Sequence, residues 1–186
     1  NFGEWKRYYK SGDVFSVGSY DEKGLPIKDW KFFYKGNKLR CKGTMSNSIM
    51  MKNGELYDKA GSLEGKGNIM LSLFSIDDKT DEMKDKMIPA LPFTFYKDGK
   101  KYLEILPASN QKEIEEAKEG EEVRRETIAK EYDPSGKLAG EGGYIFIPTQ
   151  AFGGKKHGCW TEGGKKVSYM MGKVQTGRLA EMSNCK

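Results

Sequence analysis

A 25-residue internal repeat opens this chain and constrains its fold more than any other feature. The segment Trp5-Lys6-Arg7-Tyr8-Tyr9 is followed by Trp30-Lys31-Phe32-Phe33-Tyr34, and a glycine lies thirteen residues after each tryptophan, at Gly18 and Gly43. Two later copies keep this frame without the tryptophan and begin at Gly54 and Ala129. Self-similarity at a period in the twenties predicts an array of identical supersecondary units.

Each unit has the pattern of a β-hairpin, because an aromatic run of alternating residues precedes a turn signal and a second alternating run. The turn centres contain residues that adopt positive φ easily, namely Gly12, Asn37, Gly61 and Gly136. Between units, residues 21–26 predict one further turn. Residues 52–55 predict another, because they contain the Asn-Gly pair favoured in type I′ hairpins. Turns at this spacing indicate an antiparallel meander.

Alternation along the strands assigns the two faces, because residues two apart point the same way. The tryptophan face is the more apolar in both copies, and we expect it to be the core. Its members in the first strand of each copy are Trp5, Arg7 and Tyr9, then Trp30, Phe32 and Tyr34. On the return strand, Cys41 falls on the same face. We expect Gly18 and Gly43 to lie beside the tryptophan of their own hairpin, where the missing Cβ leaves room for the indole.

The opposite face places ammonium groups beside aromatic rings. Its candidate binding residues are Lys6, Tyr8, Lys10, Lys31, Phe33 and Lys35. Such a surface can stack on a sugar or planar group, or dock the acidic and apolar surface of a partner protein. The alternative interpretation is a solvated sheet face whose lysines discourage edge-to-edge aggregation.

The repeat nearly vanishes over an insertion at about residues 70–128. Two segments there predict short helices, residues 77–87 and residues 110–119, the second with a capping box and a terminal glycine. Between them, residues 93–102 predict a hairpin with an Asp98-Gly99 turn. The predicted fold is one mostly β repeat domain over residues 1–186, an antiparallel hairpin array forming an extended twisted sheet, with one or two short helices in the insertion.

Residues 3–20 and 28–45 resemble the variant MORN repeats of bacterial proteins, which often carry an antitoxin-like label. The shared pattern is Gly-Glu-Trp-Lys-x-Tyr-Tyr with a later Gly-x-Tyr. Residues 54–69 and 129–144 match it without the tryptophan, and residues 156–160 match the lead-in to a tryptophan. The resemblance implies a hairpin array and supplies no catalytic residues.

Composition and motifs favour no cofactor or metal. A net charge of +5 without clustered basic motifs argues against nucleic-acid binding. No cysteine pair has zinc-site spacing. Export would allow one disulfide between two of Cys41, Cys159 and Cys185, and the sequence does not choose the pair. The acidic residues of 77–85 lack calcium-loop spacing, and His157 has no accompanying nucleophile motif.

The leading functional hypothesis is a non-enzymatic module that binds another protein or an envelope component, with antitoxin or immunity activity as a narrower version. An exported or envelope location is favoured over the cytoplasm, and the oligomeric state is not predicted. A second hypothesis is an enzyme acting on a glycan or peptide through a carboxylate pair. The available acids are Glu55, Asp58, Glu64 and Asp133. A third is peripheral membrane attachment through the basic face.

Overall fold

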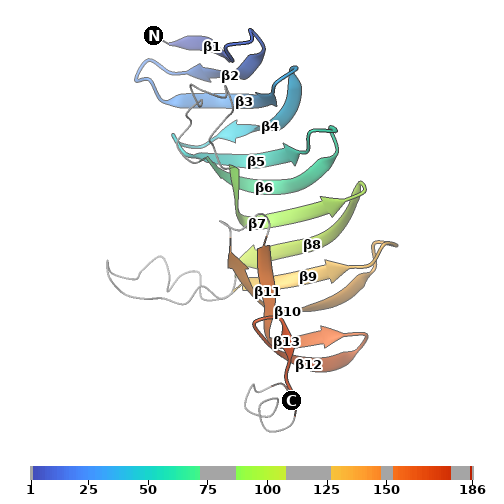
Figure 1. The fold of residues 1–186 in the computed structure, drawn as a ribbon. Helices are drawn as coiled ribbons and strands as arrows, with labels where there is room; N and C mark the ends of the chain where they lie inside the picture. Colours follow the sequence, from blue (N-terminus) through green and yellow to red (C-terminus); the bar gives the residue numbers. More distant parts are fainter. Residues whose placement is uncertain (1, 72–86, 108–126, 148–152, 177–184, 186) are drawn as a thin grey trace. The chain divides into compact units, whose positions relative to one another are not determined.

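The computed structural model describes residues 2–71, 87–107, 127–147, 153–176 and 185, which contain a thirteen-stranded antiparallel sheet (Figure 1). The strands lie in the sheet in chain order, so each pairs with its sequence neighbours. The first seven are β1 (Gly3–Tyr8), β2 (Val14–Tyr20), β3 (Pro26–Tyr34), β4 (Lys38–Met45), β5 (Met50–Tyr57), β6 (Leu63–Leu71) and β7 (Met87–Lys97). The others are β8 (Lys100–Pro107), β9 (Thr127–Tyr132), β10 (Leu138–Ile147), β11 (Gly153–Glu162), β12 (Lys165–Met170) and β13 (Lys173–Val174). The predicted mostly β hairpin array is confirmed.

Part of the insertion predicted at about residues 70–128 belongs to the sheet. The helices expected at 77–87 and 110–119 lie outside the described residues, except that Met87 begins β7. The hairpin expected between them is present. Its turn residues Asp98 and Gly99 have φ of 52° and 72°, as a type I′ turn requires. Residues 87–107 therefore belong to the regular sheet, which corrects their placement in an irregular insertion.

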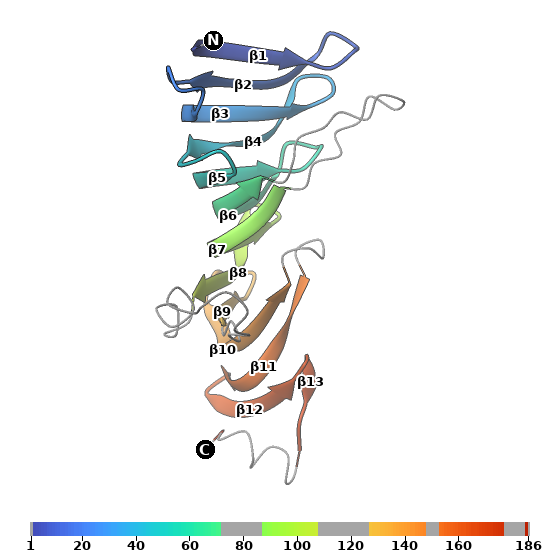
Figure 2. The same ribbon diagram turned by 90° about the vertical axis from the view of Figure 1, so that its left-hand side faces the viewer.

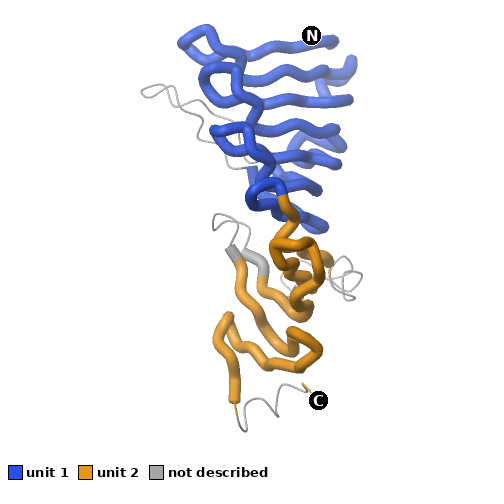
Figure 3. The backbone as a smooth tube through the Cα atoms, turned by 90° about the vertical axis from the view of Figure 1, so that its right-hand side faces the viewer, with its two compact units in different colours: residues 1–99 blue, residues 100–186 orange. Residues whose placement is uncertain are grey.

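The chain divides into two compact units, residues 1–99 and residues 100–186 (Figure 3). The first unit contains β1 to β7 and the repeat copies that begin at Trp5, Trp30 and Gly54. The second contains β8 to β13 and the copy that begins at Ala129. The expectation of a single repeat domain stays a prediction.

The hairpin turns have the predicted chemistry. Gly12, Gly61 and Gly136 have φ between 87° and 93°, and Asn37 has a φ of 57°. Glycine adopts this left-handed region without a steric penalty, which explains its recurrence seven residues into the unit. The turn predicted at residues 52–55 is wrong, because these residues lie inside β5.

The tryptophan face is the core of the first unit, as predicted. Its buried members include Trp30, Phe32, Cys41, Met51 and Leu56. Trp5 is the exception, since 38% of its surface is exposed against 5% for Trp30. Cys41 is fully buried, and desolvation raises the pKa of its thiol to about 12.

The recurring glycine is covered by the next unit rather than by its own hairpin. Gly18 pairs with Trp5 and Gly43 with Trp30, so the predicted register is confirmed. However, a Cβ on Gly18 would lie 2.0 Å from Cδ2 of Trp30. The indole over Gly18 therefore comes from the following strand, which corrects the expectation that Trp5 occupies this space. Contacts of this kind join successive units.

A β-bulge recurs at the same position in all four copies. The register of each hairpin shifts so that one residue of the return strand has no directly opposed partner: Phe15, Arg40, Glu64 and Ala139. Each lies ten residues after the start of its unit. Because a bulge locally increases strand twist, its recurrence gives every unit the same bend.

Tyrosine hydroxyls also connect consecutive units. The hydroxyl of Tyr9 donates to the carbonyl of Phe33 at 2.8 Å, and that of Tyr34 donates to the carbonyl of Tyr57 at 3.0 Å. Both tyrosines lie four residues after the start of their units. The end of each hairpin is thus hydrogen-bonded to the corresponding strand of the next.

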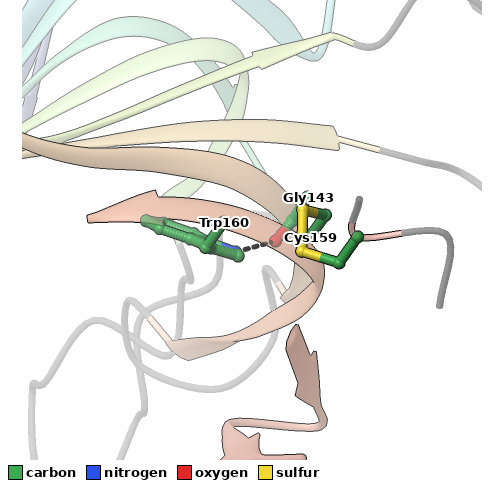
Figure 4. The surroundings of a disulfide bond; sticks show 4 residues. Gly143, Cys159 and Trp160 are labelled. Atoms are coloured by element: carbon green, nitrogen blue, oxygen red, sulfur yellow. Dashed lines mark hydrogen bonds between the residues drawn. A yellow bond between two sulfur atoms is a disulfide. The ribbon is translucent and has the colours of Figure 1, made fainter. Parts of the chain in front are cut away.

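In the second unit, Trp160 takes the place that Trp30 has in the first. It is fully buried, and a Cβ on Gly142 would lie 2.6 Å from its ring. Its Nε1 donates to the carbonyl of Gly143 at 2.5 Å (Figure 4). The adjacent residue, Cys159, forms a disulfide with Cys185. The sequence had left this pairing open.

Candidate binding face

The face of the first unit opposite the tryptophans, here called the outer face, carries a row of charged side chains across the strands. Register pairing aligns Lys6 with Val17, Val17 with Lys31, and Lys31 with Lys42. The row continues through Glu55 to Lys66. Residues directly opposite in an antiparallel pair have Cβ atoms about 4.5–5.5 Å apart. The ammonium groups therefore lie on one side of the sheet at close intervals.

Glu55 organises the centre of this row. Its carboxylate pairs with Lys42 Nζ at 2.9 Å and with Lys66 Nζ at 2.8 Å, and it accepts a hydrogen bond from the Tyr57 hydroxyl. Hydrogen bonds from Lys66, Tyr57 and Lys42 lower the pKa of Glu55 to about 2. Hydrogen bonds to Glu55 in turn raise the pKa of both lysines. The cluster is therefore fully ionised near neutral pH, with its lysines held in place.

Lys31 has a different environment from the lysines bound by Glu55. Its cross-strand neighbours in the row are Val17 and Lys42. Two like charges directly opposite in a sheet are unfavourable. Lys42 is ion-paired with Glu55 on its other side.

A second row on the outer face is aromatic and aliphatic. Tyr8 is paired with Val14, and Phe33 with Leu39. These aromatic residues lie three residues after the start of their units, and Tyr57 has the same position in the third copy. Tyr8 is exposed, and Phe33 and Tyr57 are half-buried. These rings therefore form a row parallel to the row of ammonium groups. In each first strand the ring lies two residues after the charged residue.

The structure places four of the six predicted binding residues on this face. Lys6 and Tyr8 lie in β1, and Lys31 and Phe33 lie in β3. The other two are in hairpin turns, at the ends of the strands rather than within the face: Lys10 and Lys35.

Sequence reasoning missed Lys42, Lys66 and Tyr57. The two lysines lie on return strands, twelve residues after the start of their units. Their alignment with the lysines of the first strands depends on the pairing register. The repeat frame contained a signal for these lysines. The residue one position into a unit lies directly opposite the residue twelve positions into it, on the two strands of the same hairpin.

Two of the acids considered for catalysis, Asp58 and Asp133, have structural partners in turns. Asp58 accepts a hydrogen bond from the Ser62 N–H at 2.8 Å within its turn. Asp133 has the same role in the β9–β10 turn, and hydrogen bonds from Ser135 and Lys137 lower its pKa. Burial, with a smaller effect of the nearby Asp58, raises the pKa of Glu64, which is one of the bulge residues.

In the second unit, the core face contains a charged cluster around Lys156. Its ammonium group lies 2.7 Å from the Glu131 carboxylate and 2.5 Å from that of Glu162. The same nitrogen is 4.4 Å from the centre of the Trp160 ring, within cation–π range. Tyr169 donates its hydroxyl hydrogen to Glu162. The single ammonium group contacts both carboxylates. We interpret the cluster as a structural element of the core face.

The remaining motifs carry no assembled chemistry in the described part of the chain. His157 lies in β11, where its Nδ1 accepts a 3.5 Å hydrogen bond from the Met171 N–H. Among the described residues, no group of three or more His, Cys, Asp or Glu side chains is placed to hold a metal ion. The acidic residues of 77–85 lie outside that part. The described residues contain no helix that is long and apolar enough to cross a membrane.

The fold and the outer face define a class, a single-sheet β-hairpin repeat protein with one basic and aromatic face. Comparison with protein-family models, curated proteins and solved structures gave no match for this chain. The resemblance to variant MORN repeats therefore remains a hypothesis based on the repeat residues.

Proposed function

We propose that this protein is a non-enzymatic binding module whose outer face docks an acidic and partly apolar surface of another protein. The observation that carries the proposal is the pair of parallel rows, one of ammonium groups and one of rings, on one side of the sheet. A rim of charges beside aromatic anchors is the composition of a protein-binding surface.

The ion-paired centre supports the same proposal. Glu55 fixes Lys42 and Lys66, so these side chains lose less conformational freedom when a partner binds. Residues 2–71 contain thirteen Lys or Arg and eight Asp or Glu. This excess of positive charge would steer an acidic partner towards the sheet.

The disulfide supports an exported or envelope location for this interaction. Disulfides form and persist in oxidising compartments and are rare in the cytosol. The Cys159–Cys185 bond would therefore be stable outside the cytoplasm. In this setting the partner would be an envelope protein or another exported protein. An immunity function, which the MORN resemblance implies, is the narrower form of the proposal.

A matched pair of double variants tests the outer face. The test variant is Lys31→Glu with Phe33→Ser, and the control is Lys23→Glu with Leu25→Ser in the β2–β3 turn. Both reverse one lysine charge and replace one apolar side chain by serine; Phe33 is half-buried and Leu25 is exposed, so circular dichroism checks that both variants are folded. Crosslinking in the native cells identifies candidate partners, and binding is then measured with each purified partner by calorimetry.

We expect the test variant to lose at least about tenfold in affinity, while the control binds as the unmodified protein does. The unmodified complex should weaken as salt is added, because exposed charges are screened over about 8–10 Å at moderate ionic strength. Equal loss of binding in both variants, or in neither, would refute the role of the face.

The two alternative hypotheses give different results in parallel assays. Membrane attachment requires that the protein bind vesicles containing anionic lipid, and that the Lys31→Glu change reduce this binding. An enzyme acting on a glycan or peptide requires turnover of such a substrate by the purified protein. If Glu64, whose pKa is raised, were its acid, Glu64→Gln would abolish turnover without unfolding the protein.

A further inference from the structure

The outer face of the first unit carries a continuous apolar stripe that crosses the strands. Strands β1 to β7 lie side by side in chain order (Figure 2). Each contributes one residue to the stripe, and these residues are Tyr8, Val14, Phe33, Leu39, Tyr57, Leu63 and Tyr96. Tyr96 is included because it lies two residues after Thr94, which pairs with Lys66 of the charged row. Tyr8 is exposed and the other six are half-buried, so each offers part of its surface to a partner.

Aromatic rings recur in the stripe at every second strand. They belong to Tyr8 in β1, Phe33 in β3, Tyr57 in β5 and Tyr96 in β7. Neighbouring strands lie about 4.7–4.9 Å apart, so the rings repeat at about 9.4–9.8 Å. The charged row lies about 6.6 Å to one side, since two residues along a strand advance by that distance. A ligand that uses the whole stripe is therefore linear and crosses the strands.

The spacing of the rings discriminates between backbone conformations of such a ligand. In a polyproline II helix every third residue faces the same way and lies about 9.3 Å further along the axis, which matches the rings. In an α-helix the residues seven apart that share a face are about 10.5 Å apart, so the mismatch reaches about 2–3 Å at the fourth ring. In an extended strand the residues on one face recur at about 6.6 or 13.2 Å, and neither distance fits.

The hydrogen-bond donors beside the stripe favour the same conformation. A polyproline II helix has no internal hydrogen bonds, so all its carbonyl groups are free to accept. The ammonium groups of the charged row can donate to them, and those of Lys42 and Lys66 are held in place by Glu55. Each ammonium group has three N–H donors, so the two ion-paired lysines can bind Glu55 and a ligand together. An α-helix offers only the carbonyls of its last turn, since the others already accept within the helix.

We propose that the outer face binds an acidic polyproline II segment of the partner, which crosses β1 to β7 with one proline on each ring. Proline suits these contacts because polyproline II ligands dock on aromatic side chains and are already ordered before binding. One acidic residue in every three would face the lysines of the charged row. This inference rests on the proposed function and names the chemistry of the segment that the outer face recognises.

Synthetic peptides test the period, the charge and the conformation separately. The probe is a fluorescein-labelled peptide of four Pro-Pro-Glu repeats. A scrambled peptide has the same prolines and glutamates at irregular spacing, so it keeps the charge and loses the period. Four Pro-Pro-Gln repeats keep the period and lose the charge. An acidic peptide with a leucine heptad pattern represents the α-helix, and circular dichroism checks the conformation of each free peptide.

We expect the Pro-Pro-Glu peptide to bind the full chain in fluorescence anisotropy titrations. The other three peptides should bind at least about fivefold more weakly, because each lacks either the aligned charges or the matching spacing. A scrambled or heptad peptide that binds as tightly as the probe would overturn the proposal. So would a Pro-Pro-Glu peptide that does not bind at its highest soluble concentration.

A matched pair of variants locates the bound peptide. Tyr8→Leu removes a ring of the stripe and keeps an apolar side chain, and Tyr102→Leu makes the same change in β8 of the second unit. Both positions are exposed, at 54% and 38%, and circular dichroism checks that both variants are folded. We expect Tyr8→Leu to weaken binding of the Pro-Pro-Glu peptide at least about threefold, and Tyr102→Leu to leave it unchanged. Equal effects of the two changes would contradict docking on the stripe.

A competition experiment separates this inference from the proposed function. The Pro-Pro-Glu peptide is added to the complex with a partner identified by crosslinking, and displacement of the partner supports both. If the Lys31→Glu, Phe33→Ser variant loses the partner while the peptide neither binds nor competes, the outer face recognises another conformation and only this inference fails. If the peptide binds and the same variant keeps the partner, only the proposed function fails.

Discussion

Substituting Gly18 tests which tryptophan covers it. An alanine Cβ there would lie 2.0 Å from the Trp30 indole, whereas ordinary van der Waals contact begins at 3.4 Å. The ring would have to retreat by roughly 1.4 Å to restore that contact. It packs against Tyr20 and Phe32, at 5.1 Å and 6.0 Å between ring centres, so it cannot move without disturbing both. We expect Gly18→Ala to cost about 1–3 kcal/mol of unfolding free energy, as overpacking does.

A double-mutant cycle separates Trp30 from Trp5. Trp30→Ala should cost about 3–5 kcal/mol, and Trp5→Ala only about 1–2 kcal/mol because its indole is partly exposed. In the Trp30→Ala background, Gly18→Ala should stabilise by roughly 0.5 kcal/mol, since alanine suits a strand better than glycine. The coupling energy would then be about 1.5–3.5 kcal/mol.

Urea titrations of the unmodified chain, the three single variants and the two double variants supply this measurement. In the Trp5→Ala background the cost of Gly18→Ala should be unchanged, because Trp5 does not occupy this space. Coupling below about 0.5 kcal/mol with Trp30, or stronger coupling with Trp5, would refute the argument that the next unit covers the glycine.

Two further predictions concern titrating groups. The lowered pKa of Glu55 means that its ion pairs contribute stability above pH about 4.5, and that this contribution is lost as pH falls towards about 2. The contribution should be at most about 1 kcal/mol, because the pairs are open to solvent, and Glu55→Gln should remove that part of the pH dependence of urea unfolding. Thiol titration should find no reactive cysteine in the folded, unreduced chain and one, Cys41, after denaturation without reductant. Three thiols in that denatured sample would refute the Cys159–Cys185 bond.

Local alternation predicted the faces of the regular parts of the strands, and it failed at the bulges and where the answer depends on contacts between units. It grouped Val14 and Leu39 with the core residues of the return strands, but the bulges place them on the outer face, opposite Tyr8 and Phe33.

The burial of Trp30 and Cys41 follows from a period of two within one strand. The residue that covers Gly18 does not, because it comes from the following hairpin. In the same way, the alignment of Lys31 with Lys42 requires the register of strand pairing.

The Asn-Gly pair at residues 53 and 54 shows a different limit. Asn53 has the positive φ of 51° that the sequence indicated, but it lies inside β5. A residue with positive φ is found both in hairpin turns and in β-bulges within strands, so the sequence signal is the same for the two. A Cβ on Gly54 would lie 2.3 Å from Ile69 Cδ1, so the glycine is required by packing on the next strand rather than by a turn.

The tyrosine hydrogen bonds between units have a consequence for how the first unit can change in length. The hydroxyl of Tyr9 donates to the strand one unit ahead, and so does that of Tyr34. Stability in such an array is a sum of terms for each unit and its nearest neighbours. If the second unit were duplicated, Tyr9 would still donate to the Phe33 carbonyl of the first copy, and the Tyr34 of the second copy would still donate to the Tyr57 carbonyl. At the new junction, the Tyr34 of the first copy would face the Phe33 carbonyl of the second. The array can therefore grow by whole units, and each added unit would extend the rows of lysines and rings by one step.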